Sequence, residues 1–332
     1  RSALSPLRSF ALLSLLQPSC WRELSMFGQL VIGPPGSGKS TFCAGMREFL
    51  TGIKRDVALI NLDPANHNLP YKCDVDIRDL IVLNEVMEEL ELGPNGALIY
   101  CMEYLEKNIN WLKKAVDKLE GKYLIFDFPG QVELFTQHRA CKKLAYVMTH
   151  DWNYRLCAVH LVDAHHCTDP NKYISVVLIS LTTMLHLETP HVNFLSKCDL
   201  IEQYGRLKFG LQFYTDVVDM KHLIPFLSDE KDPFAKKHKK LSENIVEVVE
   251  NFSLVNFSPL SVVEKESMKN ALKLIDKAIG YVRMPRERNA VLNMVSRDSG
   301  MDSDTIQYFR QKYTHHSKAE VDEKKAADSM AK

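Results

Sequence analysis

The chain has 332 residues, of which 42 are lysine or arginine and 42 are aspartate or glutamate, so its formal net charge is zero. This balance argues against proteins that coat nucleic acids or bind membrane surfaces, because both need a broad basic surface. Apolar residues make up 45% and charged residues 25% of the chain, which is typical of a globular protein with a sizeable core. We therefore predict no direct nucleic-acid binding and no membrane binding.

Residues 1–25 differ in composition from the rest of the chain. They carry three arginines and no acidic residue before Glu23. Their apolar run, Phe10 to Leu16, is much shorter than the ~20 residues needed to span a bilayer. Since Met26 stands directly before the first strand-like run, we predict that residues 1–25 are a non-native or targeting-like extension, disordered and outside the fold.

The eight cysteines are spaced irregularly, and no two of them form a Cys-x-x-Cys pair. In a chain of this length, such usage is typical of reduced core thiols in an intracellular protein rather than of a disulfide framework or a zinc site. The adjacent side chains of His165, His166 and Cys167 diverge on an extended segment, so we do not expect them to share a metal ion.

From Phe27 onward, short β-rich runs alternate with helical patterns. Most of the β-rich runs are continuously apolar, which is typical of parallel strands buried on both faces. We predict a three-layer α/β fold with a mostly parallel sheet flanked by helices. The predicted strands are Gln29–Ile32, Val57–Leu62, Tyr123–Phe126, Leu156–Val162, Val192–Leu195 and Leu254–Phe257. The predicted helices are Lys39–Leu50, Asp76–Glu89, Glu103–Leu119, Asn171–His186, Gly205–Val218, Leu241–Glu250 and Lys265–Gly280.

Residues 201–251 carry only helical signal, which is long for a single crossover between strands. We predict a helical insertion there, within a main domain of residues 26–282. The tail, residues 283–332, turns polar and ends in a charged stretch, so we predict that it is partly disordered.

The strongest motif is GPPGSGKST at residues 33–41, which matches the P-loop pattern G-x-x-x-x-G-K-[ST] between a strand run and a helical pattern. Its glycines let backbone amides turn toward a β-phosphate, and the following helix offers free N–H groups to the anion. The lysine reaches the β- and γ-phosphates, and the serine hydroxyl ligates Mg²⁺. We predict a P-loop NTPase that binds a nucleoside triphosphate through Gly36, Ser37, Gly38, Lys39, Ser40 and Thr41.

A second motif, DFPGQ at residues 127–131, follows another apolar run. An aspartate at a strand end places a carboxylate near Mg²⁺, and Gly130 leaves room for its amide to approach the γ-phosphate. Gln131 is of the type that orients the attacking water in GTPases. A plain strand-to-turn Asp-Pro-Gly remains the alternative for Asp127.

The motif SKCD comprises Ser196, Lys197, Cys198 and Asp199 and ends a further apolar run. It resembles the guanine-reading motif, in which the aspartate accepts hydrogen bonds from the base and the lysine stem lies along the base plane. Adenine lacks that donor pair, so a buried unpaired carboxylate would reject it. Ser196 replaces the usual asparagine, and a structural turn stays open. We expect Ser258, Pro259 and Leu260, after the last strand, to form the loop that backs the base.

Two further motifs carry weaker local signals. NLDPA, residues 61–65, ends the second strand and places Asp63 beside the P-loop, where it could contact Mg²⁺-bound or attacking water. An Asx turn is the alternative for Asp63. By local physics, Gly93, Pro94 and Asn95 together with Gly96 form only a helix stop and a tight turn.

Taken in order, GPPGSGKST, NLDPA, LGPNG, DFPGQ and SKCD resemble the GPN-loop GTPase family over about residues 27–282, with paralogue two as the most similar branch. The resemblance implies a dimeric GTPase with a P-loop core. It also implies that Gly93, Pro94 and Asn95 of one subunit reach the γ-phosphate region of the partner. Asp63 and Asp127 take the family's water-positioning and metal-associated roles, and Gln131 takes its glutamine role. The implied metal ligands are Ser40, Asp63 and Asp127, and the implied catalytic residues are Asp63, Asp127, Gln131 and Asn95.

By the same resemblance, the expected activity is Mg²⁺-dependent hydrolysis of GTP to GDP and phosphate. The expected partners are a second copy or a sibling GPN-loop GTPase, and RNA polymerase II subunits or assembly factors. The expected location is the cytoplasm, with shuttling to the nucleus as an open alternative. A nucleotide-gated scaffold in which hydrolysis is dispensable is the second hypothesis. A P-loop nucleotide kinase is a weaker third, because no Arg-rich lid stands between Asp127 and Asp199.

Overall fold

The computed structural model describes residues 26–205, 207–227 and 233–282, together with Glu287. The predictions made for residues 1–25, and for the tail apart from Glu287, lie outside the described residues. Among the residues described, no helix is both long and apolar enough to cross a membrane. The seven cysteines in this part of the chain are unpaired, and all of them except Cys73 are buried.

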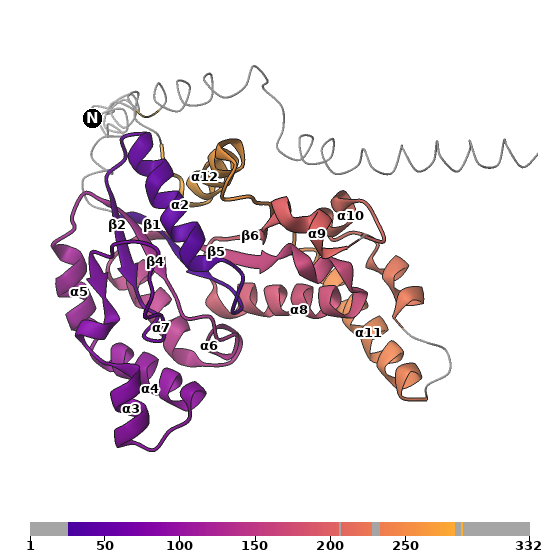
Figure 1. Cartoon of the computed structure of the whole chain (residues 1–332), viewed down its shortest axis with the longest axis horizontal. Helices are drawn as coiled ribbons and strands as arrows, with labels where there is room; N and C mark the ends of the chain where they lie inside the picture. The colour runs from indigo at the N-terminus through magenta and orange to yellow at the C-terminus, as the bar shows by residue number, and fades with distance from the viewer. Residues whose placement is uncertain (1–25, 206, 228–232, 283–286, 288–332) are drawn as a thin grey trace, which may run out of the picture.

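The described strands form one seven-stranded sheet in the order β3-β2-β4-β1-β5-β6-β7 (Figure 1). Every neighbouring pair runs parallel, which confirms the predicted α/β class with helices on both faces. The strands are β1 (Phe27–Ile32), β2 (Val57–Asn61), β3 (Val75–Asp76), β4 (Tyr123–Asp127), β5 (Arg155–Asp163), β6 (His191–Ser196) and β7 (Phe257–Pro259).

The alternation of side chains along β5 explains why helices cover both faces of the sheet. Cys157, Val159 and Leu161 pack into one apolar cluster with α2 (Lys39–Gly52) and α12 (Lys265–Ile279). Leu156 and Ala158 point the other way and join the cluster that contains α4, α5 and α7. Because successive side chains of a strand point to opposite faces, an unbroken apolar run requires a helical layer on each side. The helices of the second face are α4 (Pro94–Lys107), α5 (Ile109–Asp117), α7 (Arg139–Tyr146) and α8 (Pro170–Leu187).

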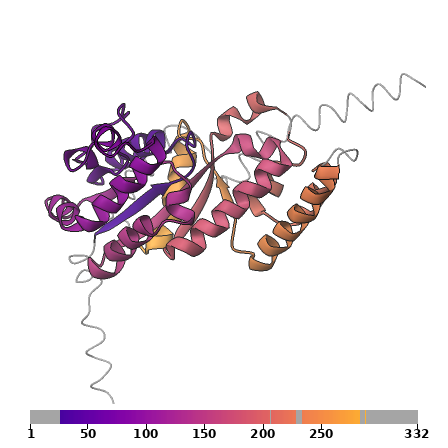
Figure 2. The same ribbon diagram turned by 90° about the horizontal axis from the view of Figure 1, so that it is seen from below.

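The segment between β6 and β7 is built from short helical pieces and one long helix. These are α9 (Ile201–Tyr204), α10 (Leu211–Asp216), a 3₁₀ turn (Met220–Phe226) and α11 (Pro233–Phe252). Helix α11 packs beside α8 at the end of the molecule away from β2, as Figure 2 shows from below. The predicted helix Gly205–Val218 is wrong in extent, because only α10 forms and the left-handed Val217 (φ 52°) ends it.

Other element predictions were wrong for identifiable reasons. The predicted helix Asp76–Glu89 splits into the end of β3, a 3₁₀ turn (Ile77–Asp79) and α3 (Leu83–Glu89), because the Asp76 carboxylate caps the Arg78 N–H. The predicted helix Glu103–Leu119 is two helices, α4 and α5, that meet at Asn108. Helix α6 (Glu133–Thr136), α7 and the π turn Val147–Asp151 had no prediction.

The last strand lies three residues later than predicted, at Phe257–Pro259 instead of Leu254–Phe257. Ser253 has a left-handed backbone (φ 49°) and Leu254 is 48% exposed, so the chain is still turning there. The strand is at the edge of the sheet, where a proline is tolerated because it has no N–H to contribute to a ladder.

Two shielded histidines lie on neighbouring strands, His160 on β5 and His191 on β6, with ring centroids 5.8 Å apart. Burial lowers the pKa of His160 to about 4 and that of His191 to about 3. Within the described part of the chain, neither ring nitrogen of His191 has a hydrogen-bond partner. Both rings are therefore neutral in the folded protein at pH values where an unfolded chain binds a proton.

We expect the protein to lose stability as the pH falls from 7 to 5. Each histidine makes its full contribution to the free energy of unfolding at pH values above about 6.5, the pKa of histidine in an unfolded chain. This contribution declines as the pH falls toward the pKa in the folded protein, and the loss is about 2 kcal/mol per histidine at pH 5. His191→Phe should remove about one histidine's share of this loss in urea unfolding at the two pH values. His150→Gln, at an exposed position, is the control. If wild type and His191→Phe lose the same unfolding free energy between pH 7 and pH 5, the assignment of part of this loss to His191 is contradicted.

Candidate active site

The predicted motifs converge at one edge of the sheet, where the parallel strands end. The register aligns Val31 of β1 with Asp127 of β4, and Asp163 of β5 with Ser196 of β6. In open α/β sheets, ligands bind in the crevice outside the carboxyl ends of the strands. This edge is therefore the candidate active site.

The loop between β1 and α2 has the backbone that an anion cradle needs. Gly33, Gly36 and Gly38 have φ values of 146°, 77° and 90°, which side chains disfavour. A Cβ at Gly33 would lie 2.3 Å from the Leu161 carbonyl oxygen. Helix α2 begins without a side-chain cap and without an acidic residue in its first turn. Its first N–H groups and its positive dipole end are therefore available to a phosphate.

Lys39 stands at the start of α2 and is buried. Its Nζ donates to the Pro34 carbonyl oxygen at 3.1 Å, within the same loop. Burial lowers the pKa of Lys39, and the carboxylates of Asp127 and Asp63 oppose this effect. The ammonium is thus held inside the cradle with little hydration, where a polyphosphate would be a strong partner.

Asp127 ends β4 and is fully buried. Its Oδ2 accepts a 2.7 Å hydrogen bond from the Tyr71 hydroxyl, whereas Oδ1 is buried with no hydrogen-bond partner among the described residues. Burial raises the pKa of Asp127, and the hydrogen bond from Tyr71, the nearby Ser40 hydroxyl and the charge of Lys39 oppose this shift. A buried carboxylate oxygen without a protein partner is unusual, and a cation or an ordered water suits it as a partner.

Asp63 follows β2 in a tight turn. Its Oδ1 accepts a 2.9 Å hydrogen bond from the Ala65 N–H, which forms the Asx turn that the sequence left as the alternative. The Asp63 N–H donates in turn to the side-chain Oδ1 of Asn61 at 3.1 Å. Burial raises the pKa of Asp63, and the Ala65 N–H and the charge of Lys39 oppose this. The turn uses only one carboxylate oxygen, so the other remains available for water.

Ser40, Asp63 and Asp127 fit Mg²⁺ by the chemistry of their oxygens. Mg²⁺ in nucleotide sites is held by one or two carboxylates, a hydroxyl, water and substrate phosphates instead of an all-protein cage. The partnerless Oδ1 of Asp127 agrees with this assignment. In the parts of the chain that the structure describes, no group of three His, Cys, Asp or Glu side chains could hold a metal ion, which includes the His165-His166-Cys167 run.

Gly130 and Gln131 lie against the P-loop. A Cβ at Gly130 would come within 2.9 Å of the Lys39 Nζ and 3.2 Å of the Pro35 Cα, so a side chain here would displace the Lys39 ammonium and press against the P-loop backbone. The Oε1 of Gln131 is shielded from solvent, and no described residue hydrogen-bonds it. This oxygen can accept a hydrogen bond from a water molecule at the γ-phosphate position.

The SKCD loop is tied directly to the P-loop. The Ser196 hydroxyl donates a 2.7 Å hydrogen bond to the Ser37 carbonyl, so serine links the two loops where the family motif has asparagine. Lys197 has a left-handed backbone (φ 58°), and its Nζ lies 2.7 Å from the Asp163 Oδ2. Asp199 is half-buried and makes no hydrogen bond or ion pair with any described residue, which leaves its carboxylate free for a base.

Ser258, Pro259 and Leu260 differ from the prediction of a loop after the last strand. Ser258 and Pro259 belong to β7, and the Leu260 side chain is fully buried in the core. The backbone of Leu260 nevertheless supports the SKCD loop, since its carbonyl accepts the Cys198 N–H at 3.2 Å. The segment therefore supports the predicted base-reading loop through its backbone, and Cys198 itself is buried.

The predicted turn at Gly93, Pro94 and Asn95 is instead the beginning of a helix. Gly93 is the N-cap of α4, and Pro94 occupies the first turn, where its missing N–H costs nothing. All three residues are exposed. The Asn95 side chain hydrogen-bonds no other described residue, so its amide is available to a group from outside this part of the chain.

Three residues that contact the site were not predicted. Tyr71 binds Asp127, Asn66 donates to the Ser40 Oγ at 3.0 Å, and Asp163 pairs with Lys197. Asp163 ends a buried strand, as Asp127 does, and that signal could have identified it. Asn66 and Tyr71 stand in an irregular loop whose path no local pattern reveals.

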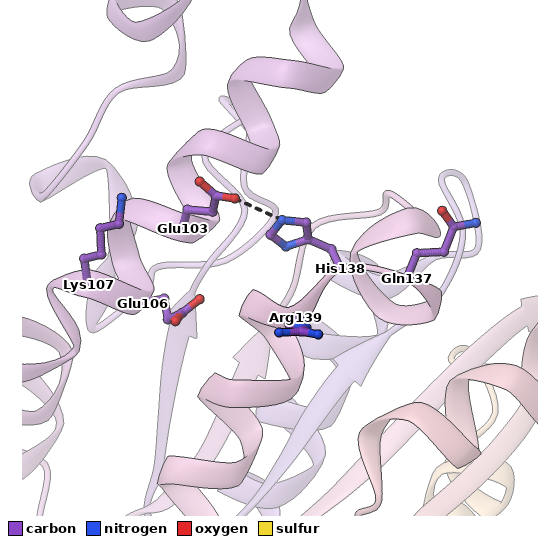
Figure 3. Close-up of a pocket in the computed structure, with 6 residues that line it drawn as sticks. All are labelled: Glu103, Glu106, Lys107, Gln137, His138 and Arg139. Carbon is purple, nitrogen blue, oxygen red and sulfur yellow. Dashed lines mark hydrogen bonds and ion pairs between the residues drawn. The ribbon is translucent and has the colours of Figure 1, made fainter.

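A separate polar pocket of about 480 Å³ lies between α4 and the α6–α7 region (Figure 3). His138 crosses it to bind Glu103, with 3.1 Å between Nε2 and Oε1. None of the residues that line it belongs to the predicted nucleotide site; they are Glu103, Glu106, Lys107, Gln137, His138 and Arg139.

Comparisons with known proteins agree with this geometry. A family described as a conserved hypothetical ATP binding protein matches residues 31–281. GPN-loop GTPase 2 of Danio rerio is 52% identical over 276 residues, which are 83% of this chain and 88% of the relative. GPN-loop GTPase QQT1 of Arabidopsis thaliana is 54% identical over 258 residues, 77% of this chain and 86% of the relative. An apo-form GTPase from Pyrococcus abyssi has a TM-score of 0.59 at 25% identity, covering 77% of this chain and 98% of that one.

The fold and the cradle define the class first: this is a P-loop NTPase, and its GTPase relatives make it a GTP hydrolase. The kinase hypothesis has no support from these relatives. The chain belongs to the GPN-loop GTPase family, and the relatives named GPN-loop GTPase 2 confirm the resemblance to paralogue two.

We expect calorimetric titration to separate the two ends of the nucleotide site. Ser196→Ala leaves a buried carbonyl unpaired, at about 1–3 kcal/mol, and should weaken the binding of GTP and GDP, and the weaker binding of ATP, by about the same factor of roughly 5 to 150. Asp199→Ala should weaken only the guanine nucleotides, because the base contact alone is lost.

Ser175→Ala removes an exposed hydroxyl of the same kind from α8 and is the matched control. Tight ATP binding by wild type, or an unchanged guanine preference in Asp199→Ala, would refute the base assignment.

Proposed function

We propose that this protein is a Mg²⁺-dependent GTPase that works as a dimeric switch in the assembly or nuclear import of RNA polymerase II. The observation that carries the nucleotide chemistry is the uncapped start of α2 beside the buried Lys39 and two carboxylates. The polymerase role rests on the family resemblance alone. The proposed location is the cytoplasm, with shuttling to the nucleus.

In the proposed reaction, water attacks the γ-phosphate, and the bond between this phosphate and the bridging oxygen breaks to give GDP and phosphate. Lys39 and the amides of Gly36 to Ser40 hold the phosphates, while Asp63 and Gln131 orient the water. Mg²⁺ bound near Ser40, Asp63 and Asp127 would neutralise charge on the phosphate oxygens. The groups that hold the phosphates are backbone amides, one lysine and the metal ligands, so the chain positions reactants more than it supplies acid or base.

The dimer proposal comes from the family resemblance, and Asn95 is the residue through which one subunit would act on the other. Its amide is exposed at the start of α4 and makes no hydrogen bond with another described residue. An amide contributed by a partner subunit could orient water or phosphate, but it would stabilise negative charge less than a cation does. We therefore infer slow turnover, which suits a switch. The partner is a second copy of this chain or a sibling GPN-loop GTPase.

Mixing two inactive variants tests catalysis across the subunits. Asn95→Ala and Lys39→Ala should each release phosphate slowly alone, Lys39→Ala because it lacks the phosphate-binding cation. In a mixed dimer, the intact P-loop of the Asn95→Ala subunit meets the intact Asn95 of its partner. Phosphate release should then recover to about a quarter to a half of wild type, since at most one of the two sites is complete.

The control mixes the single variant Lys39→Ala with the double variant that carries both Lys39→Ala and Asn95→Ala. No dimer of these two chains has a complete site. Recovery in the control would show contamination. No recovery in the first mixture, in dimers shown to have exchanged subunits, would contradict the role of Asn95 across the interface.

The alternative, a nucleotide-gated scaffold in which hydrolysis is dispensable, draws on the segment between β6 and β7. Helix α11 exposes Leu241, Val248 and Phe252 at 54%, 45% and 48%, at helical spacing along one stripe. Apolar side chains grouped in this way on a surface helix are typical of a site that binds another protein.

Client assembly separates the switch from the scaffold. For a hydrolysing switch, we expect Lys39→Ala and Gln131→Leu both to lose most co-purification of RNA polymerase II subunits, because one fails to bind and the other fails to reset. Gln137→Leu, at an exposed glutamine on the same segment, is the matched control. Assembly retained by Gln131→Leu alone would favour the scaffold, and assembly retained by both variants would rule out gating by the nucleotide.

A further inference from the structure

Two side chains from one segment, residues 62–74 between β2 and β3, reach the proposed metal ligands. The Asn66 Nδ2 donates to the Ser40 Oγ at 3.0 Å, and the Tyr71 hydroxyl donates to the Asp127 Oδ2 at 2.7 Å. The sequence motifs assign no task to either residue. Each of them contacts a different candidate ligand, so the segment contacts the site at two points.

These hydrogen bonds determine which oxygen atoms stay available. A serine hydroxyl has one hydrogen to donate and two lone pairs, one of which accepts from Asn66. Tyr71 occupies the Oδ2 of Asp127 and leaves the buried Oδ1 without a described partner. A lone pair of Ser40 and the Oδ1 of Asp127 are therefore the free ligand atoms on the two residues.

The segment is held in place by contacts that do not involve the site. Arg47 of α2 hydrogen-bonds the carbonyl of Lys72, next to Tyr71. The Asp74 N–H donates to the Leu59 carbonyl at 2.7 Å, and the Leu59 N–H donates to the Asp74 Oδ2 at 3.0 Å. The Tyr71 ring packs against the apolar cluster of α2. Tyr71 is thus positioned by the fold, whatever occupies the site.

We propose that Tyr71 and Asn66 are positioning residues that orient Asp127 and Ser40 toward the metal ion and thereby set the affinity of the nucleotide complex for Mg²⁺. This inference rests on the proposed magnesium dependence. Partners that hydrogen-bond metal ligands orient them, and losing one typically costs about 10- to 100-fold in metal affinity. Neither residue is assigned a contact with the nucleotide.

The test measures the release of a fluorescent GDP analogue from the full chain over a range of Mg²⁺ concentrations and in EDTA. We expect Mg²⁺ to slow release from wild type. Tyr71→Phe keeps the ring and its packing but removes the hydroxyl, and it should raise the half-saturating Mg²⁺ concentration about 10-fold while leaving release in EDTA unchanged. Asn66→Ala should act in the same direction. Tyr146→Phe, an exposed tyrosine, is the matched control.

The outcomes separate this inference from the proposed function. If release from wild type does not depend on Mg²⁺, the magnesium proposal itself fails. If wild type depends on Mg²⁺ and Tyr71→Phe has the same half-saturating concentration, the positioning role of Tyr71 is overturned. Faster release by Tyr71→Phe to the same extent in Mg²⁺ and in EDTA would also overturn it, because a general loosening of the pocket would not be specific to the metal. Thermal unfolding without nucleotide checks that Tyr71→Phe folds like wild type.

Discussion

The hydrogen bond from the Ser196 hydroxyl to the Ser37 carbonyl joins two loops that are 159 residues apart in the chain. One loop is the predicted phosphate cradle, and the other carries the carboxylate that would select the base. In the proposed binding mode a nucleotide bridges the same two loops, which this bond already joins through the protein itself. Because the bond is buried, water competes with it little, and it holds the two loops together more strongly than an exposed hydrogen bond would.

The candidate site combines one lysine with two carboxylates, and burial and the neighbouring charges act in opposite directions on the pKa of each group. Lys39 and Asp127 are buried and Asp63 is half-buried. Burial lowers the pKa of Lys39 and raises the pKa values of Asp63 and Asp127, while the opposite charges nearby resist these shifts. The two carboxylates exceed the one lysine, which leaves a net demand for positive charge. A divalent cation that arrives with an anionic polyphosphate would meet this demand, which is the physical basis for the proposal that phosphate and Mg²⁺ bind together.

Much of this arrangement could be predicted from the sequence, because it depends on local rules. Unbroken apolar runs predicted parallel strands, and glycines beside a lysine predicted the cradle at residues 33–41. Contacts that depend on the path of irregular chain could not be predicted. Tyr71 reaches Asp127 across 56 positions through a loop without periodicity, and Ser196 substitutes for asparagine through a bond that only the fold defines. The start of α4 was missed since Gly-Pro signals both a helix stop and a helix start.

Glu287 stands beyond the end of α12, yet its side chain is only 3% exposed. It lies 3.5 Å from Arg55, whose guanidinium is also bound by Asp276 at 2.9 Å and stacks on the Tyr281 ring at 3.9 Å. Arg55 lies in the turn between α2 and β2, where its N–H donates to the Leu50 carbonyl. The Glu287 carboxylate, near the C-terminal end of the chain, therefore packs against the turn that leads into β2. A shortened version of the chain that stops at the end of α12 would therefore leave a buried cation with less of its compensating charge, and expression boundaries are better set well after Glu287.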